Sequence, residues 1–514
     1  MTLFDEWALT LAVFLPLVGM ALVLLIPRGQ ETAVKAVALI TSLVTLGVGV
    51  GILTQFNYGK ARALQFSVNE SWIDVINSRF HLGIDGISLP LLILSMLIVP
   101  LCIIYSWNHF PEPHNPKAFL ALILLLEVGM NGTFVSQDLI LFFIFFEVVL
   151  LPMFFMIGVW GGPNREYASI KFFLFTLFGS ALMLVAFLAL FFTSKEATFD
   201  MVRLAQFGGS GIDHTTQLLI FAGLFLGFAI KVPMFPFHTW LPDAHTEAPT
   251  VGSVLLAAVL LKLGTYGFIR IALPILPDAA EAWAPWIGLL AVIGIIYGAL
   301  CCLAQRDMKR LIAFSSVSHM GFVMLGIATL TSFGINAAVF GMVAHGLITG
   351  MLFFVAGSVG ERYHTREMGR LGGLLTQAPK LGWILGFSAM ASLGLPGLAG
   401  FWGEFPAILA AYEPANLANG LFGTSNLVTF RSFMIVAAIG TVLAAGYLLW
   451  MLQRVAFGKP KPEFEATHIH DVHASEWIAW TPILVLIVVL GIFPGLLFSI
   501  TDGAASSLTK VFGG

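Results

Sequence analysis

The sequence predicts an all-α polytopic membrane protein of about fourteen transmembrane helices, with two inverted five-helix repeats and two broken helices, in spans seven and twelve. With 58% apolar residues, 10% charged residues and a mean hydropathy of +0.93, the chain has too few polar side chains to cover a soluble globule of 514 residues. Apolar windows long enough to cross a bilayer recur along the whole chain. A few ionisable residues stand inside these windows, and prolines accompany two of them.

Windows of about twenty apolar residues suffice to cross a bilayer as a helix. We expect fourteen of them, at approximately residues 8–27, 33–54, 87–106, 117–135, 138–159, 168–193, 217–237, 250–273, 284–304, 311–331, 334–358, 381–410, 430–457 and 478–500.

The first 27 residues are expected to stay in the protein as its first span. They carry Asp5 and Glu6 and no basic residue ahead of the apolar stretch, which is the opposite of a secretory signal. Connections after odd-numbered spans hold fifteen of the 25 lysines and arginines, and the other side holds eight. Because basic residues collect in cytoplasmic connections, both termini are predicted on the outer face.

Two spans are predicted to break. Lys231 ends the apolar run of span seven and is followed by Pro233 and Pro236, each of which lacks a backbone donor. Span twelve is too long for one straight helix and contains Pro396 and, later, Pro406. A charge beside a helix break indicates an ion site near the middle of the bilayer, because freed carbonyls are tolerated there only where protein surrounds them.

Two pairs of ionisable residues indicate an internal repeat. Glu147 in span five lies 172 positions before His319 in span ten, and Lys231 lies 173 positions before Glu404. Five spans separate the members of each pair, and an odd number of crossings inverts one copy relative to the other. The expected organisation is a three-helix segment (1–116), a first half of spans four to eight (117–273), a second, inverted half (274–457), and a cytoplasmic loop with the last transmembrane helix (458–514).

Several ionisable side chains lie inside or beside the predicted spans. A lysine that faced lipid at the bilayer centre would cost about 2.5 to 3.5 kcal/mol on insertion scales, so these groups must pair or be hydrated. A series of Glu, Lys and His in a water-penetrated interior is typical of a proton relay, because neighbouring charges can shift each group between protonation states. Glu147 beside Lys231 would act as a switch. The set is Glu127, Glu147, Lys231, His238, Lys262, His319, His345 and Glu404.

Each of these residues also has a structural explanation. The lysines and the carboxylates of spans five and twelve could form ion pairs that only hold helices together. The histidines could be neutral core residues bonded to hydroxyl groups, and Glu127 could be a packing carboxylate. Axial haem ligation is a further alternative for some pair among His238, His245, His319 and His345.

The sequence contains no Walker loop, no GxGxxG opening a helix after a strand, and no nucleophile motif. The three cysteines have no CxxC spacing, which argues against iron–sulfur clusters and structural zinc. His468, His470 and His473 resemble a metal site, but their place in the last connection favours a solvated loop. We therefore expect no cofactor or metal on this chain, and no nucleic-acid partner.

Three stretches resemble one family closely. Residues 230–233 read IKVP, residues 237–250 read FHTWLPDAHTEAPT, and residues 261–267 read LKLGTYG. They resemble the antiporter-like membrane subunits of respiratory complex I, a superfamily that includes cation/proton antiporter and membrane-bound hydrogenase subunits. The resemblance covers nearly the whole chain. Glu404 stands where chains L and N typically carry lysine, and only about fourteen residues follow span fourteen, without chain L's lateral helix. The chain therefore resembles the M type.

The resemblance implies one hydrated proton path whose charge state responds to quinone reduction elsewhere in the complex. The matched positions are Glu147 for the carboxylate of span five, Lys231 for the broken-helix lysine, Lys262 for the linking lysine of span eight, His319 for the connecting residue of span ten, Glu404 for the terminal residue of span twelve, and His238 and His345 for further polar residues along the path.

The implied function is that of a proton-translocating, non-redox membrane subunit of NADH:quinone oxidoreductase in the bacterial cytoplasmic (inner) membrane. NADH, FMN, iron–sulfur clusters and quinone are expected on other subunits, and chains L and N are the expected partners on either side. Protons would be taken up near Lys262 or His319, stored on Lys231 and delivered through Glu404. The alternatives are a subunit of a multisubunit Na+/H+ antiporter or membrane-bound hydrogenase, or a scaffold that only bridges its neighbours.

Overall fold

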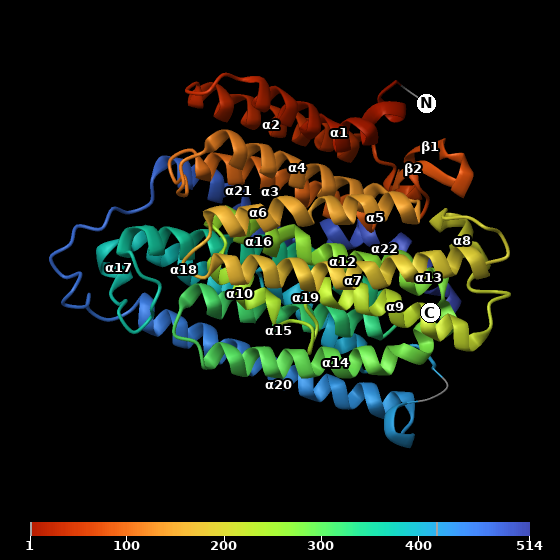
Figure 1. Ribbon diagram of the computed structural model, residues 1–514. Helices are drawn as coiled ribbons and strands as arrows, with labels where there is room; N and C mark the ends of the chain where they lie inside the picture. Colours follow the sequence, from red (N-terminus) through yellow and green to blue (C-terminus); the bar gives the residue numbers. More distant parts are fainter. Residues whose placement is uncertain (1–2, 418–419, 514) are drawn as a thin grey trace.

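The computed structural model describes residues 3–417 and 420–513 as a bundle of long helices that run side by side (Figure 1). Within these residues, thirteen helices are long and apolar enough to cross a bilayer. The twelfth expected span is not among the thirteen because it is divided into two shorter helices. The predicted fold class and approximate number of spans are confirmed.

The thirteen spans are α1 (Leu3–Leu25), α2 (Glu31–Gln55), α3 (Ser88–Ser106), α4 (Pro116–Val135), α5 with α6 (Leu139–Val148 and Leu150–Trp160), α7 (Arg165–Thr193), α9 (His214–Lys231), the segment Thr250–Ile275, α14 (Pro277–Leu303), α15 (Met308–Ala328), α16 (Ser332–Tyr363), α20 (Asn426–Val455) and α21 (Ala474–Ile492). The shorter helices are α8 (Met201–Phe207), α10 (Trp240–Glu247), α17 (Leu374–Gln377), α18 (Pro379–Ser392), α19 (Ala399–Ala410) and α22 (Gly495–Thr509).

The spans differ in how deeply they are buried within the chain. The most apolar window of α16 is 100% buried and that of α15 is 94% buried, against 33% in α2 and 39% in α20. Figure 1 accordingly shows α1 and α2 on one side of the bundle, α14 and α20 on the opposite side, and α15 and α16 between them. Helices that face lipid can be apolar all round, whereas the deeply buried helices α15 and α16 carry His319 and His345.

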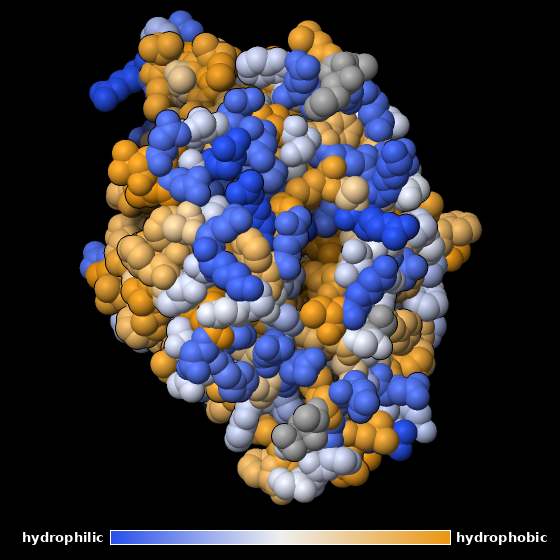
Figure 2. Space-filling view, turned by 90° about the vertical axis from the view of Figure 1, so that its right-hand side faces the viewer, coloured by the Kyte–Doolittle hydropathy of each residue, from blue (hydrophilic) through white to orange (hydrophobic). Residues whose placement is uncertain are grey.

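Both chain ends lie at the same end of the helices, together with the strands and α8 (Figure 1). The opposite end carries α17 and the connection between α20 and α21. Figure 2 looks onto the end with the termini: polar residues gather over its middle, and apolar residues lie along its rim. This distribution suits a protein whose end faces water while its circumference faces acyl chains. Because both termini lie at the same end of the helices, the chain must cross the bilayer an even number of times.

The predicted break in span seven is present. Helix α9 ends at Lys231, and α10 begins at Trp240, after Pro233 and Pro236. The prolines remove donors that the last turn of α9 would need. The indole nitrogen of Trp240 donates a 2.9 Å hydrogen bond to the carbonyl oxygen of Ile230, so one carbonyl at the break is bonded within the bundle.

The predicted break in span twelve is also present, at its first proline only. Helix α18 ends at Ser392 and α19 begins at Ala399. The backbone between them turns at Gly394 and Gly397, whose φ angles are +79° and +95°, a region that glycine adopts at little cost. The second proline, Pro406, lies inside α19 and does not interrupt it.

The charged residue stands on a different side of the break in each of the two broken spans. Lys231 is the last residue before its break, whereas Glu404 is the sixth residue of the helix that follows its break. The local likeness between the sequences KVP and EFP therefore does not extend to their position on the broken helices. The wider inverted relation of the two halves, and the four-part division of the chain, stay predictions.

Two parts of the fold differ from the sequence-based expectation. The connection between α2 and α3 contains an antiparallel hairpin of β1 (Gln65–Ile73) and β2 (Ser78–Ile84). The last span ends at Ile492, earlier than expected, because Pro494 stops the helix. A further helix, α22, follows and packs along α16, with a hydrogen bond from Asn336 to Asp502. The C-terminal region therefore holds a span and a second helix, not a span and a short tail.

Candidate functional site

Lys262 lies in the interior of the bundle with 0% of its surface exposed. The segment that carries it is irregular: α11 (Thr250–Leu255), α12 (Leu261–Gly267) and α13 (Leu273–Ile275) alternate with two π-helical turns, Leu256–Leu260 and Phe268–Ala272. A π turn is wider than an α turn and often marks a functional position. The first π turn contains Ala257, whose carbonyl oxygen accepts a hydrogen bond from Nζ of Lys262, five residues later. The irregular helix thus supplies an acceptor for its own buried lysine.

The second partner of Lys262 is a histidine. Nζ lies 2.7 Å from Nδ1 of His345, on α16. An ammonium group has donors and no acceptor, so Nδ1 accepts, and the proton of the neutral imidazole is assigned to Nε2. Nε2 is buried and has no hydrogen-bond partner. Among the described residues, no carboxylate oxygen lies within 4.0 Å of Nζ of Lys262, so the lysine has no ion-pair partner. Its hydrogen-bond acceptors are both neutral groups.

His319, on α15, makes contacts at both ring nitrogens. Nδ1 lies 2.5 Å from Oε1 of Glu404, on α19. Nε2 lies 3.1 Å from the hydroxyl oxygen of Ser392 and 3.1 Å from that of Tyr447, on α20. The break in span twelve accounts for two of these contacts, because α18 ends at Ser392 and the following half-helix brings Glu404 to the other side of the same ring.

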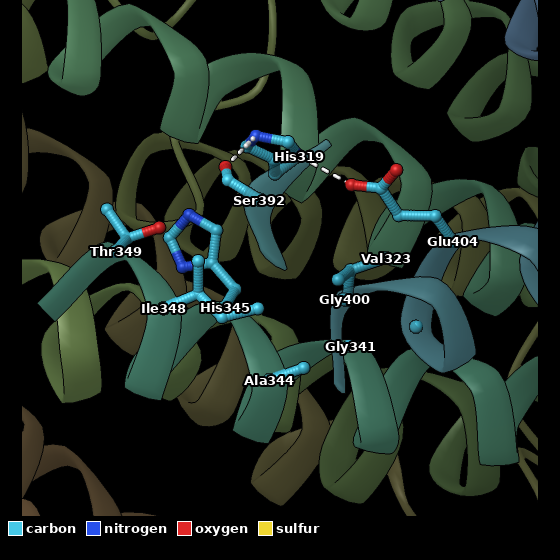
Figure 3. Close-up of a pocket in the computed structure, with 11 residues that line it drawn as sticks. His319, Val323, Gly341, Ala344, His345, Ile348, Thr349, Ser392, Gly400 and Glu404 are labelled. Carbon is cyan, nitrogen blue, oxygen red and sulfur yellow. Dashed lines mark hydrogen bonds and ion pairs between the residues drawn. The ribbon is translucent and has the colours of Figure 1, made fainter. Parts of the chain in front are cut away.

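A small cavity lies between the two histidines (Figure 3). The space open to the centre of a water molecule is about 20 Å³. Its polar wall includes the two rings, Thr349, Ser392 and Glu404, and the two ring centres are 6.0 Å apart. The cavity has room for one water and none for a porphyrin, which argues against haem ligation by His319 and His345.

The predicted interaction between Lys231 and Glu147 is electrostatic and not a direct contact. They interact electrostatically, but Nζ and the carboxylate are more than 4.0 Å apart, the limit for an ion pair. Nζ instead lies 4.8 Å from the ring centre of Phe146, a cation–π contact. Phe146 is therefore the side chain in contact with the ammonium group, while Glu147 acts on it only through its charge.

The helices that carry Lys231 and Lys262 pack directly on each other. At Gly264 an added Cβ would lie 2.7 Å from the carbonyl oxygen of Phe228, so only glycine permits this approach. The two lysines therefore belong to neighbouring segments, although no hydrogen bond joins them.

Three other ionisable candidates stand apart from these contacts. His238 is buried against the ring of Tyr297, at 5.0 Å between ring centres. His245 stacks on Phe353 and has no partner at either ring nitrogen. Glu127 is fully buried on α4 with both oxygens unpartnered. None of the three is bonded to Lys262 or to the histidines of the cavity.

The histidines of the last connection do not form a metal site. Within residues 3–417 and 420–513, no group of three or more His, Cys, Asp or Glu side chains is placed to hold a metal ion. His473 instead caps α21, and its backbone N–H donates to the carboxylate of Glu476 (2.8 Å). This arrangement has a structural explanation in helix capping.

Comparison with known proteins places this geometry in a family. The family described as "NADH:quinone oxidoreductase/Mrp antiporter, TM" matches residues 136–429, and "NADH-ubiquinone oxidoreductase chain 4, amino terminus" matches residues 11–133. The NADH-quinone oxidoreductase subunit M of Rickettsia bellii is 39% identical over 98% of this chain and 99% of its own length. The chain belongs to the NADH:quinone oxidoreductase/Mrp antiporter family.

Solved structures support the same membership. A chain of respiratory complex I from Thermus thermophilus matches 98% of this family member and 100% of its own length, with a TM-score of 0.86 and 29% identity. A chain of the Mrp complex from a Dietzia species matches with a TM-score of 0.84 and 21% identity over 99% and 98% of the two chains, which shows the shared fold alone. The neighbours of this family member are multisubunit membrane complexes.

In this antiporter-like subunit, sequence reasoning missed several residues of the site. Ser392 and Tyr447 are hydroxyl residues in apolar helices, and nothing in their sequence context distinguishes them from other hydroxyls of the spans. The π turns around Lys262 also left no signal, because the segment is uniformly apolar. The break before Glu404 was the one usable pointer to Ser392, the residue at which the first half-helix ends.

Proposed function

We propose that this chain moves protons across the bacterial cytoplasmic membrane as a non-redox subunit of respiratory complex I. The relay comprises Glu147, Lys231, Lys262, His319, His345 and Glu404, with His238 as a peripheral member. One observation carries the proposal: His345, which is bonded to Lys262, lines the same small polar cavity as the bonded pair His319 and Glu404. Such a series can hold and pass protons between groups that alternate their protonation states.

The bonding of Lys262 favours proton transfer over a structural ion pair. A buried charge kept for stability is normally compensated by an opposite charge. Lys262 has only a carbonyl oxygen and an imidazole nitrogen as partners, both neutral. Its proton therefore has a ready acceptor in His345. By contrast, the Glu404 carboxylate at the far side of the cavity is suited to receive a proton from His319.

The driving reaction belongs to other subunits. The relatives are named as parts of NADH-quinone oxidoreductase, so NADH, FMN, iron–sulfur clusters and quinone are assigned to the rest of the complex. We place chains of the L and N types on either side of this one, and both termini on the outer face, in accordance with the excess of basic residues in the opposite connections.

Coupled pumping in inverted membrane vesicles tests the proposal. NADH-driven proton uptake is measured in vesicles that carry Lys262→Ala or Glu404→Ala in the assembled complex. We expect uptake to fall at least tenfold. The matched control is Lys35→Ala, because Lys35 is a largely buried lysine bonded to Glu31 and Trp107, outside the relay. Wild-type uptake in both relay variants would refute the proposal.

The scaffold alternative makes the opposite prediction. If the chain only bridges its neighbours, a triple variant that neutralises Lys231, Lys262 and Glu404 should assemble and pump normally. The Na+/H+ antiporter alternative rests on lysine motifs that the two kinds of subunit share, whereas 39% identity to a subunit M over nearly the full length favours the complex I assignment. Assembly without pumping would exclude the scaffold.

A further inference from the structure

His345 presents a proton that has no acceptor. Because Lys262 donates to Nδ1, the proton of the neutral ring is on Nε2. This nitrogen is buried and unpartnered, although His345 lines the cavity between the histidines. A buried donor without a partner is destabilising, so an acceptor is expected beside it.

His319 carries its proton on the opposite nitrogen. Glu404 contacts Nδ1, and a carboxylate accepts, so Nδ1 donates. At Nε2 the fully buried hydroxyl of Tyr447 has His319 as its partner, and the hydroxyl of Ser392 lies equally close. Nε2 can accept from these two hydroxyls only if it carries no proton. The contacts of Glu404, Ser392 and Tyr447 with His319 are thus all consistent with one tautomer, in which Nδ1 carries the proton and Nε2 accepts.

The cavity between these nitrogens has the size and lining of a water site. About 20 Å³ is open to the centre of a water, and roughly 10–15 Å³ is enough for one molecule. A water also needs two to four polar partners. His345, Thr349, Ser392 and Glu404 supply donors and acceptors around the space, while Ala344 is among the apolar residues that close it (Figure 3).

We propose that the cavity binds one structural water, which joins His345 Nε2 to the Ser392 hydroxyl, that Ser392 passes the proton on to His319, and that Tyr447 is a positioning residue for His319. This inference deepens the proposed function and rests on it. One proton then travels by five linked transfers. Lys262 protonates His345 at Nδ1, and His345 releases its Nε2 proton to the water. The water gives a proton to Ser392, and Ser392 gives its own hydroxyl proton to His319 Nε2.

The last transfer completes the balance. His319 releases its Nδ1 proton to Glu404, so one proton leaves Lys262 and one reaches Glu404. The two rings end in the opposite tautomers. The Tyr447 hydroxyl then faces an Nε2–H group and can no longer donate to that nitrogen, which favours the return of His319 to its first tautomer. Tyr447 is therefore expected to affect the rate of repeated transfer, beyond holding the ring in place.

Filling the cavity tests the water site without changing an ionisable group. Ala344→Val adds two methyl groups to the cavity wall, which excludes the water. Ala356→Val makes the same change on the same buried helix, away from the cavity lining, and controls for overpacking. In assembled complex I, we expect NADH-driven proton uptake to fall at least tenfold in the first variant and by less than twofold in the second.

A second set of variants keeps the test valid if the valine variant does not assemble. Tyr447→Phe and Ser392→Ala each remove one hydroxyl and little volume, and Ser392→Thr retains the hydroxyl. We expect several-fold losses of uptake in Tyr447→Phe and Ser392→Ala, with unchanged thermal stability of the complex and recovery in Ser392→Thr. If the two hydroxyls had only a structural role, proton uptake would fall only in variants whose thermal stability also falls, whether or not the hydroxyl is present.

A density map of the wild-type complex gives the direct observation. We expect one water peak within about 3.2 Å of His345 Nε2 and of a Ser392 or Thr349 hydroxyl, absent from the Ala344→Val complex. If Ala344→Val and Tyr447→Phe pump normally while Glu404→Ala does not, the proposed function stands and the one-water link is wrong. If Glu404→Ala also pumps normally, the relay itself is wrong.

Discussion

His319 Nδ1 and Glu404 Oε1 lie 2.5 Å apart, joining α15 to the second half of a broken helix. The contact forms because the chain leaves one helix at Ser392, turns at Gly394 and Gly397 and enters the next helix at Ala399, so that both half-helices reach one imidazole ring. Replacing either partner leaves the other group buried and unpaired. The pair is thus the point at which the fold and the proposed proton path depend on the same atoms.

A double-mutant cycle on this pair should show strong coupling. Glu404→Gln and His319→Gln are each expected to reduce proton uptake at least tenfold. The double variant should lose little more than either single variant, because both changes interrupt one transfer step. Uptake is measured per NADH oxidised. Losses that multiply would show that the two residues act in separate steps.

Replacing the central lysine should separate function from stability. Lys262→Met removes a buried charge that has no carboxylate partner and replaces it with an apolar side chain of similar length. We expect thermal stability of the complex to stay the same or rise, because a desolvated charge is costly. Proton uptake should be lost. A marked fall in melting temperature would mean that Lys262 serves mainly to hold the helices together.

A single methyl group added to α12, the helix that carries Lys262, should destabilise the bundle. Gly264→Ala places a Cβ 2.7 Å from the carbonyl oxygen of Phe228, which the two packed helices can relieve only by moving apart. We expect a cost of about 1–3 kcal/mol, typical of overpacking, seen as a lower thermal midpoint. The control is Gly386→Ala on α18, where the added Cβ meets nothing within 4 Å, and it should be neutral or stabilising.

The hairpin is expected to depend on a buried ion pair outside the membrane spans. Asp200 caps α8 and lies 2.6 Å from Nδ1 of His81 on β2. Burial alone would raise the pKa of Asp200, but the hydrogen bond from His81 and the other donors hold that pKa below its usual value. The stability that this carboxylate contributes is thus complete above its unfolded pKa of about 3.9 and is lost as pH falls through the lower folded pKa.

Asp200→Asn measures that contribution at neutral pH. Backbone hydrogen exchange of β1 and β2 should become faster in the variant, while exchange in α16 stays unchanged. The control is Asp74→Asn in the exposed turn of the same hairpin. Equal protection of the strands in the two variants would show that Asp200 does not anchor the hairpin.

The orientation of the chain can be read from chemical labelling. Val75 is 95% exposed at the tip of the hairpin, at the end of the bundle with both termini. His468 is exposed in the connection at the opposite end. In intact cells, Val75→Cys should react with a membrane-impermeant maleimide and His468→Cys should not. Inverted vesicles should give the reverse pattern, and the opposite result would place the termini in the cytoplasm.

Much of the fold follows from the sequence alone. The bilayer requires about twenty apolar residues per crossing, so composition along the chain is enough to count the spans. Proline and glycine act locally on the backbone, which is why the breaks at Lys231 and in span twelve were predictable. The cost of burying ionisable groups likewise identified Lys262, His319, His345 and Glu404 before any coordinates were known.

The partners of these groups were decided by the tertiary structure. Lys262 bonds to His345, 83 residues away, and His319 meets Tyr447, 128 residues away, because packed helices bring those faces together. A uniformly apolar helix gives no sign of which face meets which neighbour, since lipid and protein interior favour the same side chains. For the same reason the sequence could place Glu147 near Lys231 but could not show that the ring of Phe146 would contact the ammonium group. The sequence determined which residues are buried and charged, and only the packing determined which atoms they reach.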